Sequence, residues 1–234
     1  MKFDPPLIET RLVKRYKRFL ADVEMPSGDI ITVHCANPGS MLGLTQPGNR
    51  AWISDSQNPK RKLQYSLEII EVNGVMVGIN TSHPNKLAKE AIEAGRIPQL
   101  TGYQTLRTEV KYGENSRIDI LLQDKNKPDT YVEVKNVHFI RTPSLHEFPD
   151  SVTARGAKHL DEMAREVEKG NRAIMLYVIQ RSDGDRFQLA SDLDPNYFDA
   201  FKRAIAKGVE AIAIRCNVSV EGIEAVDLLQ INDI

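Results

Sequence analysis

The chain has 234 residues, a formal net charge of −1 and 41% hydrophobic residues. A chain of this length buries a substantial core and suits one large domain or two small ones. It has no apolar run of membrane-spanning length and no signal-peptide core, so we expect neither a membrane protein nor an exported one. Cys35 and Cys216 lack metal-ligand spacing and are typical of buried thiols in a reducing compartment, which predicts a cytoplasmic protein.

Short strand-like runs separated by turn signals fill residues 1–80. The turn signals are PSGD at 26–29, NPGS at 37–40, QPGN at 46–49, QNPK at 57–60 and NG at 73–74. Many short strands at even spacing are typical of a small β-barrel. We therefore predict a barrel domain over residues 1–80, with strands at 7–13, 18–24, 30–35, 50–54, 63–72 and 75–79.

Residues 11–18 form a basic run within this part. Arg15, Lys17 and Arg18 lie in it beside the rings of Tyr16 and Phe19. One hypothesis is an electrostatic track for nucleic-acid phosphates, with one ring as a stacking platform for a base. Strand alternation would put the two rings on opposite faces, so both cannot serve one surface. The alternative is an ordinary charged strand pair on a barrel surface.

From residue 81 the spacing of hydrophobic residues changes from a strand-like pattern to a helical one. Leu87, Ala88, Ala91 and Ile92 recur at helical spacing, and Gly95 follows as a helix stop. Next come predicted strands at about 105–112, 117–122 and 130–137, a helix at 150–169, a strand at 173–180, a helix at 197–206 and a strand at 209–216. This order predicts an α/β (α+β) second domain over residues 81–234, whose last segment gives little signal.

Three charged residues on two of these strands form the pattern D-x13-E-x-K. Glu133 and Lys135 share a strand face, because successive side chains point to opposite sides. If Leu122 pairs with Thr130 in a hairpin, antiparallel register sets Asp119 opposite Glu133. The two carboxylates would then be close enough to touch one cation.

These residue types suit metal-dependent phosphodiester chemistry. Two carboxylates offer hard oxygen ligands for Mg²⁺, which keeps several waters and takes other ligands from phosphate. The metal lowers the pKa of a bound water, and Lys135 can orient that water or hold the phosphate. The alternative is a solvated surface ion pair, because a single D/E-x-K pattern occurs by chance in most chains of this size. The interleaved valines and the upstream aspartate favour a site.

The predicted helix at 150–169 carries a second polar cluster. Arg155, Lys158 and His159 lie at i, i+3 and i+4 and therefore on one helix face. Arginine and lysine on one face can hold phosphate, and histidine adds a donor. The alternative is a partly solvated helix face. Gly156 costs about 1 kcal/mol relative to alanine inside a helix, which indicates a close backbone approach to the sheet or to a ligand.

Several segments of the chain resemble the bacterial and archaeal sugar fermentation stimulation protein A (SfsA) family. They lie in a fixed order over nearly the whole chain: RYKRFLADV (15–23), HCANPGSM (34–41), LTGYQTLRTEVKYG (100–113), SRIDILL (116–122), YVEVKNV (131–137), FPDSVTARGAKHLDEM (148–163) and DPNYF (194–198). The resemblance implies an N-terminal OB-type β-barrel followed by a domain like the PD-(D/E)xK nucleases. It also implies non-specific DNA binding and a link to sugar metabolism, notably that of maltose.

The resemblance bears on individual residues as well. In the nuclease superfamily a glutamate on the helix before the meander often joins the metal cluster, which implies a metal-ligand role for Glu90. The alternative to a metal-ligand role is that Glu90 is an exposed helix residue beside Lys86 and Lys89. The superfamily usually has proline before the first aspartate, where this chain has Ile118 before Asp119. This departure leaves the ligand intact.

Three function classes follow from the sequence. The resemblance and the basic run favour a DNA-binding protein of low specificity, acting as an accessory or regulatory factor. Asp119, Glu133 and Lys135 favour a Mg²⁺-dependent nuclease. A small-molecule-responsive regulator of sugar genes is the third class, although no residues indicate a sugar pocket or a helix-turn-helix. We predict the first two together, with a non-catalytic DNA-binding factor that keeps only the nuclease fold as the alternative. The sequence leaves the oligomeric state open, a homodimer included.

Overall fold

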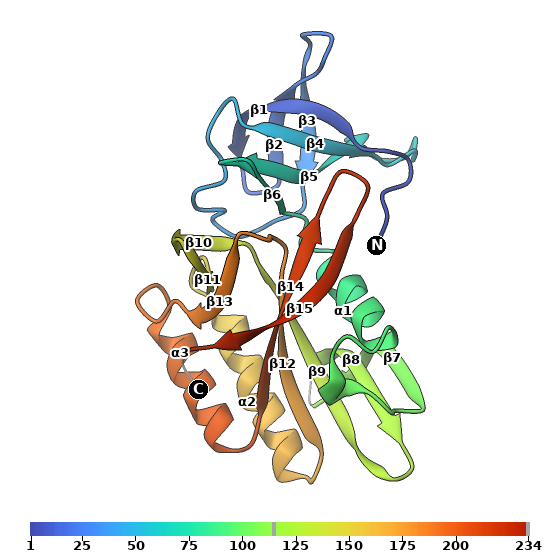
Figure 1. Ribbon diagram of the computed structural model, residues 1–234, viewed down its shortest axis with the longest axis vertical. Coiled ribbons are helices and arrows are strands. Elements are labelled where there is room, and N and C mark those ends of the chain that lie inside the picture. The colour runs from blue at the N-terminus through green and yellow to red at the C-terminus, as the bar shows by residue number, and fades with distance from the viewer. Residues whose placement is uncertain (114–115, 233–234) are drawn as a thin grey trace.

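The computed structural model describes residues 1–113 and 116–232 and shows a barrel seated on one end of a larger α/β domain (Figure 1). The barrel strands are β1 (Ile8–Tyr16), β2 (Leu20–Glu24), β3 (Ile30–Cys35), β4 (Arg50–Asp55), β5 (Tyr65–Val72) and β6 (Val75–Gly78). They pair in the order β3-β2-β1-β4-β5-β6, and an additional parallel pairing of β3 with β5 closes the sheet. Inward residues such as Leu12, Val33 and Leu67 form its buried core.

The first hairpin of the barrel differs from the predicted one. β1 extends to Tyr16, and residues 17–19 form the turn that precedes Leu20. Lys17 and Arg18 have φ angles of 49° and 61°. The expectation of regular alternation across residues 14–19 is therefore wrong, because left-handed backbone ends the strand pleat at Lys17.

The second domain begins with α1 (Pro84–Glu93) and the 3₁₀ turn η1 (Pro98–Leu100). The elements that follow are β7 (Thr105–Tyr112), β8 (Ser116–Asp124), β9 (Lys127–Val137), β10 (Phe139–Thr142), β11 (Ser144–Phe148), α2 (Ala154–Glu168), β12 (Arg172–Ile179), β13 (Gly184–Leu189), α3 (Pro195–Ala206), β14 (Glu210–Val218) and β15 (Ile223–Ile231). The strands form one sheet in the order β10-β11-β13-β15-β14-β12-β9-β8-β7.

The β7–β8–β9 meander is antiparallel, and its last hairpin has the expected register. Leu122 pairs with Thr130, and Ile120 pairs with Val132. The central part of the sheet is parallel, because β9 pairs in parallel with β12 and β12 with β14. β12 is buried along almost its whole length, as expected for a parallel strand covered on both faces.

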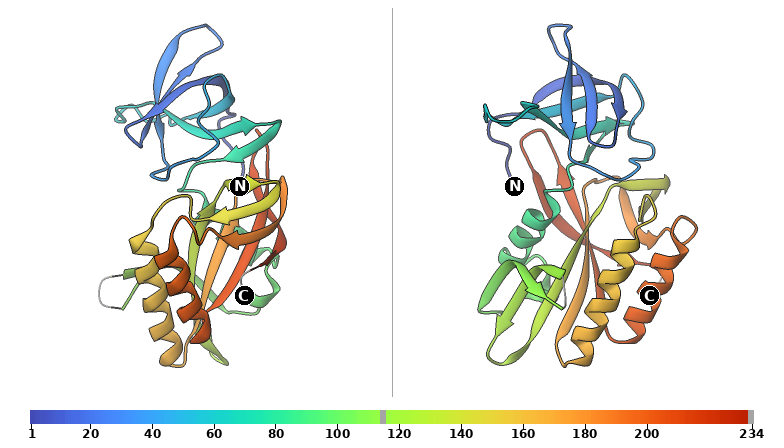
Figure 2. Two further views of the ribbon diagram at one scale, coloured as in Figure 1. Left: turned by 90° about the vertical axis from the view of Figure 1, so that its left-hand side faces the viewer. Right: turned by 180° about the vertical axis from the view of Figure 1, so that it is seen from behind.

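Helices cover both faces of the sheet (Figure 2). α1 packs against one face through Leu87 and Ile92, which join a core containing Ile120 and Val132. α2 and α3 lie side by side over the other face, where Met163 of α2 joins a separate core.

Four strands lie outside the elements expected from the sequence. β10, β11 and β13 extend one edge of the sheet, and β15 pairs antiparallel with β14. These strands are short or partly exposed, and the β10–β11 and β11–β13 registers are both shifted. Such strands carry a weak hydrophobic period, so only pairing with distant segments defines them.

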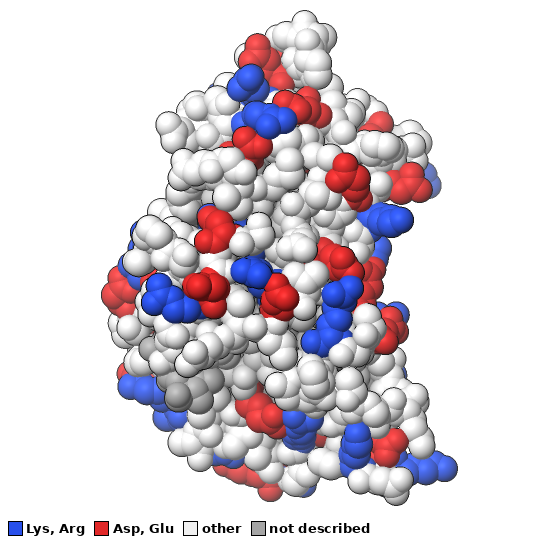
Figure 3. All heavy atoms as spheres, in the orientation of Figure 1, with Lys and Arg blue, Asp and Glu red and all other residues white. Residues whose placement is uncertain are grey.

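Charged side chains are dispersed over the one face of the molecule that Figure 3 shows. Positive and negative side chains are intermixed on the face shown in Figure 3. Among the described residues, no helix combines the length and the apolar character needed to cross a membrane.

Candidate active site

Two carboxylates from neighbouring strands face one cavity of about 620 Å³. Asp119 lies on β8 and Glu133 on β9, and Lys135, Arg155 and His159 line the same cavity. The β8–β9 register and the alternation of strand side chains put the carboxylates on one side of the sheet. The structure therefore brings together the three residues of the D-x13-E-x-K pattern.

Asp119 is held by two hydrogen bonds. Its Oδ2 accepts from the backbone N–H of Val134 at 2.7 Å, and its Oδ1 accepts from Nδ2 of Asn85 at 2.8 Å. Burial raises the pKa of Asp119 above its ordinary value, and the negative charge of Glu133 adds to the rise. The two hydrogen bonds oppose this shift by stabilising the charged form. Asp119 is thus the member of the pair that binds a proton more readily than usual.

The pKa of Glu133 is shifted in the opposite direction from that of Asp119. Burial pushes its pKa up, but the hydrogen bond from His159 and the positive charge of Lys135 outweigh burial and lower the pKa overall. Lys135 Nζ donates to Glu133 Oε1 at 2.7 Å, and His159 Nδ1 donates to the same oxygen. The other oxygen, Oε2, is buried and has no hydrogen-bond partner among the described residues.

His159 is fixed on α2 by its neighbours. Arg155 Nε donates to His159 Nε2 at 3.3 Å, so Nδ1 is the ring nitrogen that carries the proton toward Glu133. Thr153 caps the helix by accepting from the N–H of Gly156. A Cβ at Gly156 would lie 3.0 Å from the ring of Tyr197 on α3, so the close approach expected at this glycine is to a neighbouring helix rather than to a ligand.

The acid pair offers a limited ligand set for a divalent cation. Among residues 1–113 and 116–232, no group of three or more His, Cys, Asp or Glu side chains is arranged to hold a metal. Mg²⁺ often binds through one or two carboxylates and fills the other positions with water and substrate phosphate. The unpartnered Oε2 of Glu133 beside Asp119 fits that mode of binding.

Two family models match most of the chain. The SfsA N-terminal OB domain matches residues 13–79, and the sugar fermentation stimulation protein RE domain matches residues 82–222. The chain belongs to the SfsA family. The predicted fold class, an OB-type barrel followed by a restriction-endonuclease-like α/β domain, is confirmed.

Similar proteins cover this SfsA-family chain from end to end. The sugar fermentation stimulation protein homologs of Brucella ovis and Brucella melitensis are each 58% identical to it, over 100% of this chain and 98% of theirs. The solved structure described as Pyrococcus furiosus SfsA in complex with Ca²⁺ has a TM-score of 0.89 at 24% identity. That comparison covers 99% of this chain and 98% of the other, and it shows a shared fold.

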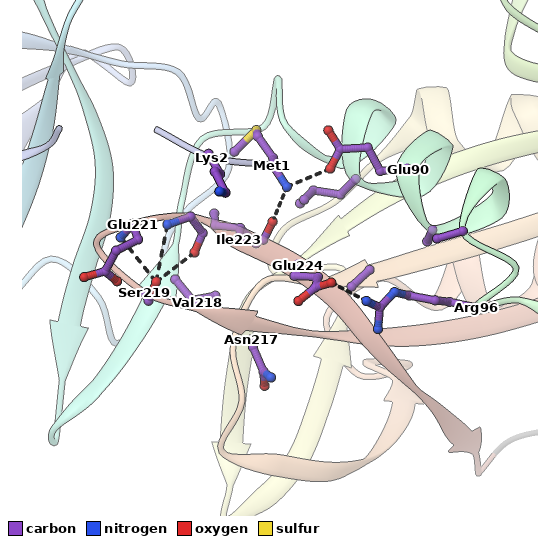
Figure 4. Close-up of a pocket in the computed structure, with 15 residues that line it drawn as sticks. Met1, Lys2, Glu90, Arg96, Asn217, Val218, Ser219, Glu221, Ile223 and Glu224 are labelled. Atoms are coloured by element: carbon purple, nitrogen blue, oxygen red, sulfur yellow. Dashed lines mark hydrogen bonds and ion pairs between the residues drawn. The ribbon is translucent and has the colours of Figure 1, made fainter. Parts of the chain in front are cut away.

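Glu90 lies away from the acid pair. Its Oε2 is 2.7 Å from the amino group of Met1, and it lines a separate pocket between α1, the N-terminal residues and the β14–β15 hairpin (Figure 4). Asn85 and Glu90 are five positions apart on α1 and therefore point to different sides of the helix. The structure places Asn85 at the acid pair in the position that the family resemblance implied for Glu90.

The structure adds residues to the cavity that the sequence did not single out, among them Thr81, Asn85, Ser116 and Arg117. Asn85 bonds Asp119 from the first turn of α1, and Ser116 and Arg117 line the cavity from the start of β8. Glu109 on β7 also lines it and accepts from Asn85 at 3.3 Å. The position of Asn85 directly after Pro84 marks it as a helix-start residue, but no sequence signal connects it to β8.

The three barrel residues predicted to bind nucleic acid, Arg15, Lys17 and Arg18, have different surroundings. The Arg15 guanidinium donates to the backbone carbonyls of Arg18, Asn37, Gly39 and Ser40 over 2.8–3.4 Å. Arg15 therefore organises the turn that follows β3. Lys17 and Arg18 are exposed in the β1–β2 turn, and Arg18 lines a second cavity between the barrel and the α/β domain.

The basic residues of α2 lie at the acid pair. Arg155 is exposed and lines the same cavity as Glu133. Lys158 also lines it, with its side chain 62% exposed and its Nζ 3.6 Å from Glu162. Both cations are thus accessible at the mouth of the cavity, whereas His159 is buried against Glu133.

Proposed function

We propose that this SfsA-family chain binds nucleic acid with low sequence specificity and cleaves it at a Mg²⁺-dependent phosphodiesterase site. One observation carries the proposal: Asp119, Glu133 and Lys135 line a single cavity in which one oxygen of Glu133 is buried and unpartnered. A buried carboxylate oxygen without a partner is costly unless a proton donor or a cation reaches it.

Each residue of the cavity has a role in this proposal. Asp119 and Glu133 hold the cation, which would polarise the phosphate and lower the pKa of a bound water. Lys135 keeps Glu133 charged and has further N–H groups to donate to a phosphate oxygen. Arg155 and Lys158 neutralise neighbouring phosphates at the mouth of the cavity. His159 positions Glu133 and touches no substrate.

Two comparisons support the cofactor and the context. A protein of the same fold is described as a complex with Ca²⁺, a divalent cation that also takes oxygen ligands. The relatives at 58% identity are named for the stimulation of sugar fermentation. The partner that we propose is DNA and the setting is the regulation of sugar metabolism, including that of maltose, as the family resemblance implies. The buried free thiols Cys35 and Cys216 accord with a cytoplasmic location.

The second candidate is a DNA-binding factor that keeps only the nuclease fold. The observation in its favour is that Glu133 Oε1 already accepts from both Lys135 and His159, which stabilises the carboxylate without a cation. In this case the cavity would bind phosphate through its basic rim and would cleave nothing.

Cleavage assays with matched variants separate the two candidates. Purified protein is incubated with single- and double-stranded DNA and RNA in Mg²⁺, Mn²⁺ or EDTA. We expect cleavage that EDTA abolishes and that Asp119→Asn reduces by a factor of at least about 100, while the exposed Asp161→Asn on α2 behaves as wild type. Binding without cleavage under all conditions would favour the second candidate. Equal cleavage by Asp119→Asn and wild type would exclude Asp119 as an essential ligand.

A further inference from the structure

A second cavity at the domain junction adjoins the cavity of the acid pair. The second cavity has a volume of about 630 Å³ and lies between the barrel and the α/β domain. Thr81, in the segment that joins the two domains, lines both cavities. β9 places Lys135 in the first cavity and Asn136 in the second. We call these two adjoining cavities together the junction groove.

The walls of the junction groove are held in place by contacts between the domains. Asp150, in the loop before α2, accepts from the N–H of Met41 at 2.9 Å, and its backbone carbonyl accepts from Ser40 Oγ at 2.7 Å. The same carboxylate lies 3.4 Å from His138 Nε2. A Cβ at Gly39 would lie 2.7 Å from Asp150 Oδ2, so the two domains touch closely here. The groove is therefore preformed.

An exposed phenylalanine, Phe19, follows the groove residue Arg18 at the barrel end and stacks on the half-buried His34. Phe19 is 45% exposed, and its ring is stacked on His34 with centroids 6.4 Å apart and planes 11° from parallel. Phe19 follows Arg18, which lines the groove, in the same three-residue turn. Arg15 ties this turn to the groove wall by bonding the carbonyls of both Arg18 and Asn37.

We propose that the junction groove binds one unpaired strand of nucleic acid, with a phosphodiester at the acid pair and a base stacked on Phe19. This inference rests on the proposed function and deepens it by naming the form of nucleic acid. Arg155 and Lys158 neutralise phosphates at the acid-pair end, and Arg18 does so at the barrel end. The stacked ring of His34 holds Phe19 as a flat platform at the outer end.

The dimensions and burial of the groove favour a single strand over a duplex. Each cavity has a volume typical of a site for one small ligand, which is enough for a nucleotide of a single strand but too small to enclose a double helix. Glu133 is only 3% exposed, so a phosphate must enter the cavity to approach it. A free aromatic platform also needs an unstacked base, which duplex interiors do not provide.

Binding measured without divalent cations tests the inference independently of cleavage. A labelled 20-nucleotide strand and its duplex are titrated with protein in EDTA, and fluorescence anisotropy is recorded. We expect the single strand to bind more tightly, and Phe19→Ala to weaken it by about tenfold, which is the usual effect of losing one stacked base. Phe19→Trp should keep the affinity. Ile30→Ala is the matched control, because Ile30 is 63% exposed at the opposite end of β3 from His34.

A second variant tests the continuity of the groove. Thr81→Trp places a large ring at an exposed position that lines both cavities, and it removes the hydrogen bond from Thr81 Oγ1 to the Ala36 carbonyl. Thr81→Ala removes the same hydrogen bond without adding a ring, so we expect Thr81→Trp to weaken binding of the 20-nucleotide strand more than Thr81→Ala does. Equal affinity for strand and duplex, unaltered by Phe19→Ala, would overturn this inference and leave the proposed function standing. No binding of either form would overturn both.

Discussion

The side-chain amide of Asn85 donates to Oδ1 of Asp119 over 2.8 Å and joins the first turn of α1 to strand β8. This bond lowers the pKa of Asp119 and so opposes the rise caused by burial and by the charge of Glu133. The protonation state of the candidate metal ligand therefore depends on a residue from another element.

Removal of this amide should change the pH dependence of cleavage. Asn85→Ala removes a contribution that lowers the pKa of Asp119, so that pKa rises further and the carboxylate is protonated over a wider range of pH. We expect the acid limb of the cleavage profile to move to higher pH, with a smaller loss of rate at alkaline pH. Cleavage rates measured from pH 5 to 9 for wild type and variant check this. Glu90→Gln, on the far side of α1, should leave the profile unchanged.

Alanine substitutions should show that Arg15 stabilises the fold and that Arg18 binds nucleic acid. Arg15→Ala removes the guanidinium from four backbone carbonyls and should cost about 1.5–3 kcal/mol of unfolding free energy, measured by urea denaturation. Arg18→Ala should leave stability within about 0.5 kcal/mol of wild type and weaken nucleic-acid binding. An unfolding free energy for Arg15→Ala equal to that of wild type would show that the contacts with the backbone carbonyls do not hold the turn.

The contact between Asp150 and the barrel should make stability depend on pH. Burial pushes the pKa of Asp150 up, but the neighbouring His138 and the hydrogen bonds from Met41 N–H and Ser40 Oγ outweigh it, so the folded-state pKa lies below the ordinary 3.8. A carboxylate with a depressed pKa stabilises the fold above its unfolded-state value, and this contribution is lost as the pH falls below about 3.8. Asp150→Asn should therefore be less stable than wild type by about 1–3 kcal/mol at pH 7.

That stability difference should shrink as the pH is lowered. Urea denaturation at pH 7, 5 and 3 gives the comparison, with Asp161→Asn as an exposed control on α2. A difference between Asp150→Asn and wild type that stays constant from pH 7 to pH 3 would show that the ionised carboxylate does not stabilise the junction.

The salt dependence of binding should report the two cations of α2. Each phosphate contact contributes a log–log salt slope of about −0.9 on duplex DNA and about −0.7 on single strands. Replacing Arg155 and Lys158 together by alanine should flatten the slope by up to about twice that amount and weaken unrelated sequences alike. The double replacement of Lys202 and Arg203, exposed on α3, is the control. An unchanged slope for Arg155 and Lys158 would mean that they contact no phosphate.

Local sequence was sufficient to predict contacts between residues that are close in the chain as well as in space. The β8–β9 hairpin has the register inferred from its alternating residues, because side chains of a strand alternate strictly and a short connection limits the pairing. Asp119 and Glu133 share a cavity for the same reason. The i, i+3 and i+4 spacing likewise brought Arg155, Lys158 and His159 to one side of α2.

The tertiary structure decided what local periodicity does not encode. The rotation of α1 on the sheet turns Asn85 rather than Glu90 toward Asp119, and that rotation depends on how the whole apolar face of the helix packs. Left-handed residues at the β1–β2 turn direct Arg18 and Phe19 away from the strand pleat. Strand β15 is defined only by its pairing with β14. The sequence by itself determined the hairpin and helix faces that carry the charged residues. Only packing between distant segments decided which of those residues meet at the acid pair and in the junction groove, because such contacts depend on the arrangement of the whole chain.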